Sequence, residues 1–226
     1  MESLQSSLFT QFNRAFIVGG GPAPAQGWLR SQFLPGDCLI AADRGATYLQ
    51  ADGLVPDLLL GDFDSLPPEL LPTLQKSCRQ CLAFPCDKDY SDLELALRAA
   101  HHLGFRHAIV AAALYGRLDH CLFNVISVLQ LADELGLEAS LVAPDCQIYQ
   151  LQQKKRSWSG CQGKLLSLIS LDEEAEVSLQ GAKWPLVHSK LRRSSTRGLS
   201  NIVIADEVTL ECHRGRVIVL LSDAEK

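Results

Sequence analysis

Short apolar runs alternate with amphipathic stretches over the first 145 residues of this 226-residue chain. The apolar runs predict buried strands at 15–18, 38–42, 58–60, 108–112 and 139–142. The stretches between them predict helices at roughly 25–34, 45–51, 67–80, 91–103 and 119–135. Strands and helices that alternate in this way predict a parallel sheet with helices on its faces. In such α/β sheets, ligands bind beyond the carboxyl ends of the strands.

The pattern changes after Pro144. Residues 150–163 are polar, with three consecutive basic residues and two glycines, and predict a linker or a long hairpin. Short alternating runs follow at 164–170, 175–180, 202–205, 208–212 and 217–221. Because turn-like glycines and polar residues separate these runs, and no helical period is evident, we expect a small antiparallel β domain.

The composition narrows the class of protein. Hydrophobic residues make up 47% of the chain and charged residues 21%, which excludes disordered, collagen-like and coiled-coil chains. No apolar run approaches the ~18 residues that a membrane span needs, and residues 1–14 lack the apolar segment of a secretion signal. We therefore expect a cytoplasmic protein without a membrane partner.

The eight cysteines are then expected to be reduced thiols in apolar surroundings. Cys78 and Cys81 have the spacing of metal ligands, but no second such pair follows to complete a zinc site. Core thiols are therefore the favoured interpretation.

Charge is divided unevenly along the chain. Residues 1–145 hold nine Lys and Arg against seventeen Asp and Glu, whereas residues 146–226 hold twelve against nine. The acidic first part argues against nucleic acid as a partner. Two differently solvated surfaces would explain this division, and so would acidic residues that gather around a cation.

Carboxylates follow several of the predicted strands. Asp43 follows the second strand, and Asp62 and Asp64 follow the third. The last two are alternate residues of an extended segment, so they point to the same side and repel one another unless a cation neutralises them. Oxygen ligands of this kind suit Mg²⁺, which also binds substrate phosphates. We favour metal ligation and a phosphate-bearing substrate over a solvated turn.

Other candidate residues have structural explanations that compete with functional ones. Gly19–Gly21 fits a tight turn near a phosphate or any strand-to-helix turn, and it completes neither a P-loop nor a dinucleotide fingerprint. Ser91 and Glu94 form a capping box, which explains both residues. Asp92, at the positive end of the same helix, fits a capping role and a functional role equally well. Arg117, on a flexible turn, suits bidentate phosphate contact.

The β domain offers fewer signals. Trp184 lies in a predicted turn, where a ring either covers the domain core or stacks on a planar or cationic ligand. Taken alone, the ring favours the core. The basic stretch 191–197 is typical of a solvated loop, and Ser200 and Asn201 follow it with compact hydrogen-bonding groups.

Together, these segments resemble the thiamine pyrophosphokinase family. The match extends from about Ala15 to Leu221, and four blocks occur in the order of the family, at 41–46, 57–65, 88–94 and 116–120. Blocks at 181–186 and 200–201 are also similar. The resemblance implies an α/β domain at 1–145 that binds ATP and Mg²⁺, followed by a β-sandwich domain at 146–226 that binds thiamine. It further implies a homodimer with active sites at the subunit interface.

The resemblance also implies a reaction and roles for single residues. The diphosphoryl group of ATP would move to the hydroxyl of thiamine and release AMP, with the identity of the proton acceptor left open. The implied Mg²⁺ ligands are Asp62, Asp64 and Asp92, which form the catalytic set with Arg117. The implied ATP contacts are Asp43, Arg44, Lys88, Asp89, Ser91 and Asp119. The implied thiamine contacts, from the partner subunit, are Trp184, Ser200 and Asn201.

Three positions depart from the pattern of the family. Tyr115 replaces the first glycine of a Gly-Gly-Arg turn, Ala182 stands where leucine is common, and Ile202 stands where a polar or acidic residue is frequent. The first bears on how closely the backbone approaches the nucleotide, and the other two bear on the second substrate.

Two other classes of protein stay open. The Asp62–Asp64 segment also resembles the nucleophile loop of haloacid-dehalogenase-like phosphatases, although that family places the loop after its first strand and here two strand–helix units precede it. A nucleotide- or thiamine-sensing module would bind ligand without releasing AMP. Trapping of an aspartyl-phosphate analogue with beryllofluoride would identify the phosphatase.

Overall fold

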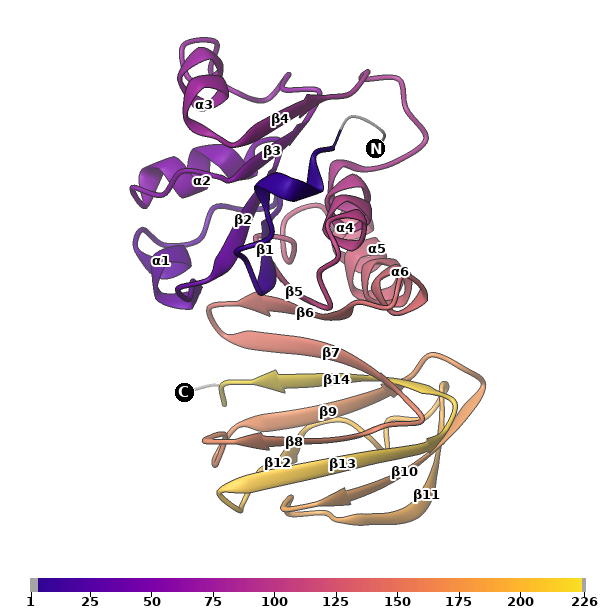
Figure 1. Cartoon of the computed structure of the whole chain (residues 1–226). Helices are drawn as coiled ribbons and strands as arrows, with labels where there is room; N and C mark the ends of the chain where they lie inside the picture. The colour runs from indigo at the N-terminus through magenta and orange to yellow at the C-terminus, as the bar shows by residue number, and fades with distance from the viewer. Residues whose placement is uncertain (1–3, 225–226) are drawn as a thin grey trace. The chain divides into compact units, whose positions relative to one another are not determined.

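The computed structural model describes residues 4–224; residues 1–3, where the polar N-terminal stretch begins, and residues 225–226 lie outside the described part (Figure 1). The chain divides into two compact units, residues 1–144 and 145–226. Each unit has its own cluster of buried apolar side chains. Within residues 4–224, no helix combines the length and the apolar character that crossing a membrane requires.

A parallel sheet forms the centre of the first unit, with the strand order β6-β5-β1-β2-β3-β4. The strands are β1 Arg14–Val18, β2 Asp37–Ala42, β3 Leu58–Gly61, β4 Gln80–Ala83, β5 His107–Ala111 and β6 Glu138–Ala143. Figure 1 shows helices on both faces of this sheet, with α1 to α3 on one face and α4 to α6 on the other. Strands that are covered on both faces must be apolar throughout, which is why they appear in the sequence as continuous hydrophobic runs.

The helices are short, and a one-turn 3₁₀ helix, η1 (Ser6–Leu8), precedes β1. Their bounds are α1 Trp28–Gln32, α2 Gly45–Ala51, α3 Leu71–Ser77, α4 Asp92–His102, α5 Leu118–Phe123 and α6 Leu129–Glu134. A π-helical segment, Asn124–Val128, joins α5 to α6. At the start of α4, the Ser91 hydroxyl accepts the Glu94 backbone N–H at 3.2 Å, so the predicted cap is confirmed for Ser91.

Two expectations for the first unit were wrong in detail. The helix expected at 67–80 is only α3, and β4 follows it as an edge strand that the sequence pattern did not predict. The strand was not predicted because it has only four residues, of which only Leu82 is buried. Its sequence therefore shows no clear alternation of apolar and polar residues. The helix expected at 119–135 is interrupted by the π-helical segment, a feature that is frequent at functional sites.

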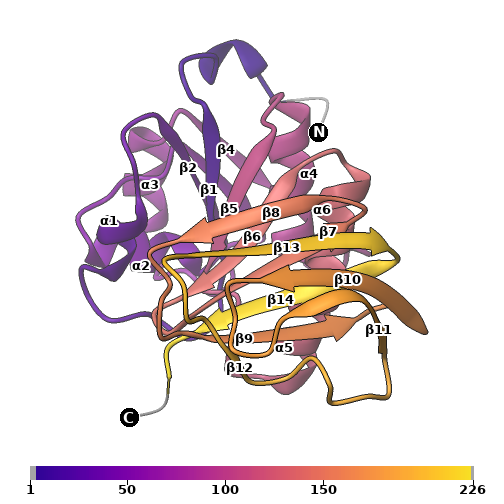
Figure 2. The ribbon, with the colours of Figure 1, turned by 90° about the horizontal axis from the view of Figure 1, so that it is seen from below.

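The second unit contains two antiparallel layers, as Figure 2 shows. One has the order β11-β10-β13-β8, and the other has the order β12-β9-β14-β7. The strands are β7 Cys146–Gln152, β8 Lys155–Ser159, β9 Leu165–Ser170, β10 Glu174–Gln180, β11 Leu186–Arg192, β12 Asn201–Ile202, β13 Glu207–Arg214 and β14 Arg216–Ser222. Buried side chains from both layers form one core, so the α/β class followed by a β-sandwich is confirmed.

The second unit also differs from expectation at three places. Residues 150–163 are neither linker nor hairpin, because β7 and β8 belong to different layers. The run at 202–205 contributes only its first residue to β12. Finally, the sequence pattern did not predict β11. His188 has a left-handed backbone, and the pairing of β11 with β10 is irregular near Val177. These irregularities break the alternation of buried and exposed residues along the strand.

Candidate active site

A cavity of about 980 Å³ opens at the carboxyl end of the parallel sheet. Its lining comes from the segments that follow β1, β2, β3, β4 and β5. In the sheet, β1 lies between β2 and β5, so the connections leave β1 and β5 toward opposite sides. This divergence is the topological switch point at which open α/β sheets bind ligands.

The glycine run after β1 forms one wall of this cavity. The Gly19 N–H donates to the Ala111 carbonyl at 2.9 Å, and the Gly21 N–H donates to the Ala112 carbonyl at 2.8 Å. A Cβ atom at Gly21 would lie 2.6 Å from the same Ala112 oxygen. The run therefore packs directly on the loop after β5. Because two of its three N–H groups are used in this packing, the tight-turn interpretation is favoured over a phosphate cradle.

Ser65 joins two of the predicted carboxylates. Its hydroxyl contacts Asp43 Oδ2 and lies 3.2 Å from Asp64 Oδ1. The Asp64 backbone N–H in turn donates to Asp62 Oδ1 at 3.2 Å. Asp43 is buried, and its Oδ1 has no hydrogen-bond partner among the described residues. The acids that follow β2 and β3 are thus parts of a single polar cluster.

Lys88 extends this cluster to α4. Its ammonium nitrogen lies 3.3 Å from Asp62 Oδ2 and 3.0 Å from Asp92 Oδ1, and only 13% of its side chain is exposed. Four carboxylates, those of Asp43, Asp62, Asp64 and Asp92, are therefore connected through one hydroxyl, one ammonium group and the Asp64 backbone N–H. With so little positive charge, the cluster is suited to bind a further cation.

The two carboxylates that contact Lys88 have opposite pKa shifts. Burial raises the pKa of Asp92, and nearby Asp43 and Asp62 raise it further, against the effect of Lys88. Burial also acts to raise the pKa of Asp62, but the Asp64 N–H and Lys88 outweigh it and hold that pKa below its ordinary value. Asp92 is thus the acid that takes up a proton more readily.

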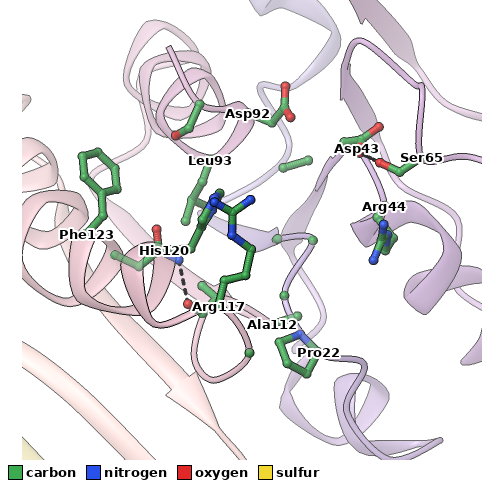
Figure 3. Close-up of a pocket in the computed structure, with 18 of the residues that line it drawn as sticks. Pro22, Asp43, Arg44, Ser65, Asp92, Leu93, Ala112, Arg117, His120 and Phe123 are labelled. Carbon is green, nitrogen blue, oxygen red and sulfur yellow. Dashed lines mark hydrogen bonds between the residues drawn. The ribbon is translucent and has the colours of Figure 1, made fainter. Parts of the chain in front are cut away.

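Arg117 reaches the cavity from the loop before α5. Figure 3 shows its side chain extending between the wall that carries Asp43 and Arg44 and the wall that carries Asp92. Its side chain is 74% exposed, and its guanidinium pairs with Asp119 at 2.7 Å. The hydrogen bonds from Arg117 and from the His120 backbone lower the pKa of Asp119 to about 2. The Arg117 guanidinium is therefore held in place while most of it stays accessible to an anion.

The donor atoms of this cluster are mostly of the type that Mg²⁺ binds. Asp62 and Asp64 supply the hard oxygen ligands that Mg²⁺ prefers, and Asp43, whose Oδ1 has no hydrogen-bond partner among the described residues, adjoins Asp64 through Ser65. One oxygen each from Asp62 and Asp64 and the sulfur of Cys86 lie within 4.8 Å of one another. The carboxylates fit the ion, whereas the thiol is a soft ligand that does not. Asp92 is connected to this group through Lys88.

The structure brings most of the predicted nucleotide residues together. Those that line the cavity are Asp43, Arg44, Lys88, Ser91, Asp92, Arg117 and Asp119. Asp62 and Asp64 lie behind Lys88 and Ser65, while Asp89 is exposed and lies outside the lining. The sequence indicated no functional role for Ser65 or Cys86, and it marked Tyr115 only as a departure from the pattern of the family. The only signal for Ser65 was its place directly after Asp64.

The expectation that the cysteines are core thiols is wrong for Cys86. All eight cysteines are free, but only Cys38, Cys161 and Cys212 are buried, and Cys86 is exposed in the cavity wall.

In the second unit, the structure joins Trp184 to Asn201. The Trp184 N–H donates to the Asn201 side-chain oxygen at 3.1 Å, and the Asn201 amide donates to the Trp184 carbonyl at 2.7 Å. Asn201 is buried, while the Trp184 ring is 53% exposed with the Lys183 ammonium 4.8 Å from its centroid. The ring is therefore a surface feature and does not cover the core. Ser200 lies exposed beside this pair.

The fold and the acidic cavity define an α/β protein with a ligand site at the switch point of its sheet and a β-sandwich unit. Two family models match the chain: "Thiamin pyrophosphokinase, catalytic domain" at residues 32–138 and "Thiamin pyrophosphokinase, vitamin B1 binding domain" at residues 148–217. The chain belongs to the thiamine pyrophosphokinase family. This assignment sets aside the phosphatase and the sensing module, and it shows the chain to be an enzyme of the thiamine diphosphokinase class.

Individual proteins show the same similarity. Thiamine pyrophosphokinase of Bacillus subtilis is 26% identical over 208 residues, which cover 91% of this chain and 97% of that protein. The crystal structure of thiamin pyrophosphokinase from Geobacillus thermodenitrificans is 30% identical, with a TM-score of 0.82 over 94% of this chain and 99% of that one. The Bacillus subtilis crystal structure, at 24% identity and a TM-score of 0.85, covers 94% of this chain and all of the other, and supports the fold.

Proposed function

We propose that this chain transfers the diphosphoryl group of ATP to the hydroxyl of thiamine, with Mg²⁺, and releases AMP and thiamine diphosphate. The observation that carries the proposal is the connected set of four carboxylates at the switch point, beside a cavity of about 980 Å³. A highly charged diphosphoryl group is transferred chiefly by positioning and by cationic stabilisation. The family to which the chain belongs supplies the identity of the two substrates.

The proposed reaction assigns a task to each side of the cavity. The thiamine oxygen attacks the β-phosphorus of ATP, the bond between that phosphorus and the α-bridging oxygen breaks, and AMP leaves. Asp92, whose pKa burial raises, accepts the hydroxyl proton. Lys88 and Arg117 bind the phosphate oxygens, and Arg44, exposed at the wall, adds a further positive charge.

Mg²⁺ is proposed to be held by Asp62 and Asp64, of which one oxygen each lies within 4.8 Å of the other, with Asp43 beside them. When bound, it supplies charge neutralisation and polarises the phosphoryl group that is transferred. Ser65 positions two of these acids through its hydroxyl. Lys88 places Asp92, the third ligand that the resemblance implies, next to them.

The thiamine side is proposed to come from the second unit of a partner subunit. Trp184 offers an exposed ring for the cationic thiamine, and Asn201 acts as a positioning residue that holds the Trp184 backbone.

A homodimer is also supported by a stripe of exposed apolar residues along α5 and the π-helical segment. This stripe consists of Leu118, Leu122 and Ile126, with exposures of 71%, 53% and 45%. Such a stripe is typical of a protein interface.

Mixing of two defective subunits tests this arrangement. Asp92→Asn and Trp184→Leu subunits, mixed at equal amounts and assayed at low thiamine, are expected to recover about a quarter of the wild-type activity, because half of the dimers are hybrids with one intact site each. Ultracentrifugation should give twice the 24.8 kDa chain mass. A monomeric mass, or no recovery in a mixture shown by mass spectrometry to contain hybrids, would rule out the shared site.

The proposed reaction is tested by chromatography of its products. The purified protein, incubated with ATP, Mg²⁺ and thiamine, should form AMP and thiamine diphosphate in equal amounts, and EDTA should abolish both. AMP without thiamine diphosphate would point to another acceptor alcohol, with Ala182 and Ile202 as the first positions to examine. Absence of AMP would refute the proposed transfer.

A further inference from the structure

Tyr115 has a backbone conformation that a bulky side chain rarely adopts. It lies in the loop that connects β5 to α5, with φ +67°, and Gly116 follows with φ +77°. This left-handed region favours glycine, since a Cβ atom crowds the neighbouring backbone there. Strain of this kind persists only where the surroundings impose it, and it is concentrated at functional sites.

The residues around Tyr115 impose this conformation. The Ala112 carbonyl accepts the Gly21 N–H at 2.8 Å, and the Ala113 carbonyl accepts the Asn124 side-chain amide at 2.7 Å. Leu114 is buried, and Gly116 packs so closely on the Pro22 ring that a Cβ atom there would lie 3.0 Å from it. The chain on both sides of Tyr115 is therefore fixed, and the tyrosine has to accept the strained backbone.

Packing in the protein core does not explain why a tyrosine occupies this position. Tyr115 is 50% exposed and lines the cavity of about 980 Å³. A glycine would adopt the same backbone without strain. The exposed part of the side chain is therefore placed where a molecule in the cavity can contact it.

We propose that the Tyr115 ring stacks on the nucleobase of the nucleotide that occupies this cavity, an inference that rests on the proposed function. Tyr115 and Arg117, the proposed phosphate contact, lie two residues apart on one loop and line the same cavity, so a single nucleotide can contact both. Tyrosine rings bind bases by stacking, whatever the identity of the base. The ring is thereby a specificity-determining group that distinguishes a nucleotide from a bare polyphosphate.

Glycine and phenylalanine variants separate this role from a structural one. The probes are ATP and inorganic tripolyphosphate, each titrated calorimetrically with Mg²⁺ into the full chain. For Tyr115→Gly we expect the dissociation constant of ATP to rise about tenfold and that of tripolyphosphate to stay within about twofold. Tyr115→Phe, which keeps the ring, should bind both probes like the wild type. The melting temperature of Tyr115→Gly should equal or exceed that of the wild type, because the strain is relieved.

Each other outcome has a definite meaning. Unchanged ATP affinity in Tyr115→Gly, or an equal loss of affinity for both probes, would overturn the stacking contact. A lower melting temperature or a changed oligomeric mass that accounts for the loss of ATP affinity would overturn it as well. In all of these cases wild-type ATP binding would leave the proposed function standing. A wild-type protein that binds neither probe would overturn the proposed function and this inference with it.

Discussion

Replacement of Asp92 by asparagine is expected to lower the formation of AMP and thiamine diphosphate by roughly 10³-fold, within the range that a positioned general base contributes. The reason is the position and environment of Asp92. It lines the cavity at the start of α4 and pairs with Lys88 at 3.0 Å, and burial raises its pKa. The amide has the same shape but cannot accept the proton. The measurement is the turnover number at saturating ATP, thiamine and Mg²⁺.

Glu94→Gln is the matched control for this variant. Glu94 lies on the same helix, but its carboxylate pairs with Arg98 at 2.8 Å and does not line the cavity. Loss of the Asp92 charge at a helix start costs only about 0.3–1 kcal/mol of stability, so both variants should remain folded by circular dichroism. Turnover of Asp92→Asn within about tenfold of the wild type would remove Asp92 from the reaction.

Much of the site was predictable because it follows from strand ends. Once the buried runs before Asp43 and Asp62 are recognised as parallel strands, the residues after them must meet at one edge of the sheet. The charge argument for a cation also needed only the sequence, since it depends on the number of acids at that edge. The order of the blocks along the chain then indicated the family.

The contacts that organise the site were not predictable in this way. Ser65 contacts Asp43 across 22 positions of sequence, and Lys88 contacts Asp62 across 26. No local pattern encodes such pairs, because they depend on how neighbouring loops are placed by the sheet. Tyr115 was noted only as a departure from the pattern of the family, and its strain becomes visible only as a backbone angle.

Asn201 has a structural contact that its motif did not indicate. The resemblance implied that it contacts thiamine, and this role is untested. In the structure both ends of its amide are engaged by the Trp184 backbone. A motif identifies the residues that a function requires, but it does not separate a residue that touches the ligand from one that holds another residue in position.

Lys88 is the residue through which the two parts of the acidic cluster are coupled. Its ammonium group lies between Asp62 and Asp92, and their negative charges raise its pKa although burial acts to lower it. Lys88 in turn helps to hold the pKa of Asp62 down. A carboxylate with a lowered pKa stabilises the fold above the ordinary aspartate pKa, and this contribution disappears as the pH falls through the lowered value.

Lys88→Met, which keeps the length of the side chain but not its charge, is therefore expected to have two effects. Turnover should fall by roughly 10²–10³-fold, because a charge-assisted contact to the transferring phosphates is lost. The melting temperature should fall at neutral pH, and the difference from the wild type should shrink as the pH falls through the lowered pKa of Asp62 and the carboxylates become protonated. Lys76→Met, an exposed lysine on α3, is the control and should change neither property. A stability difference that is the same at all pH values would contradict the coupling, and unchanged turnover would remove Lys88 from the phosphate site.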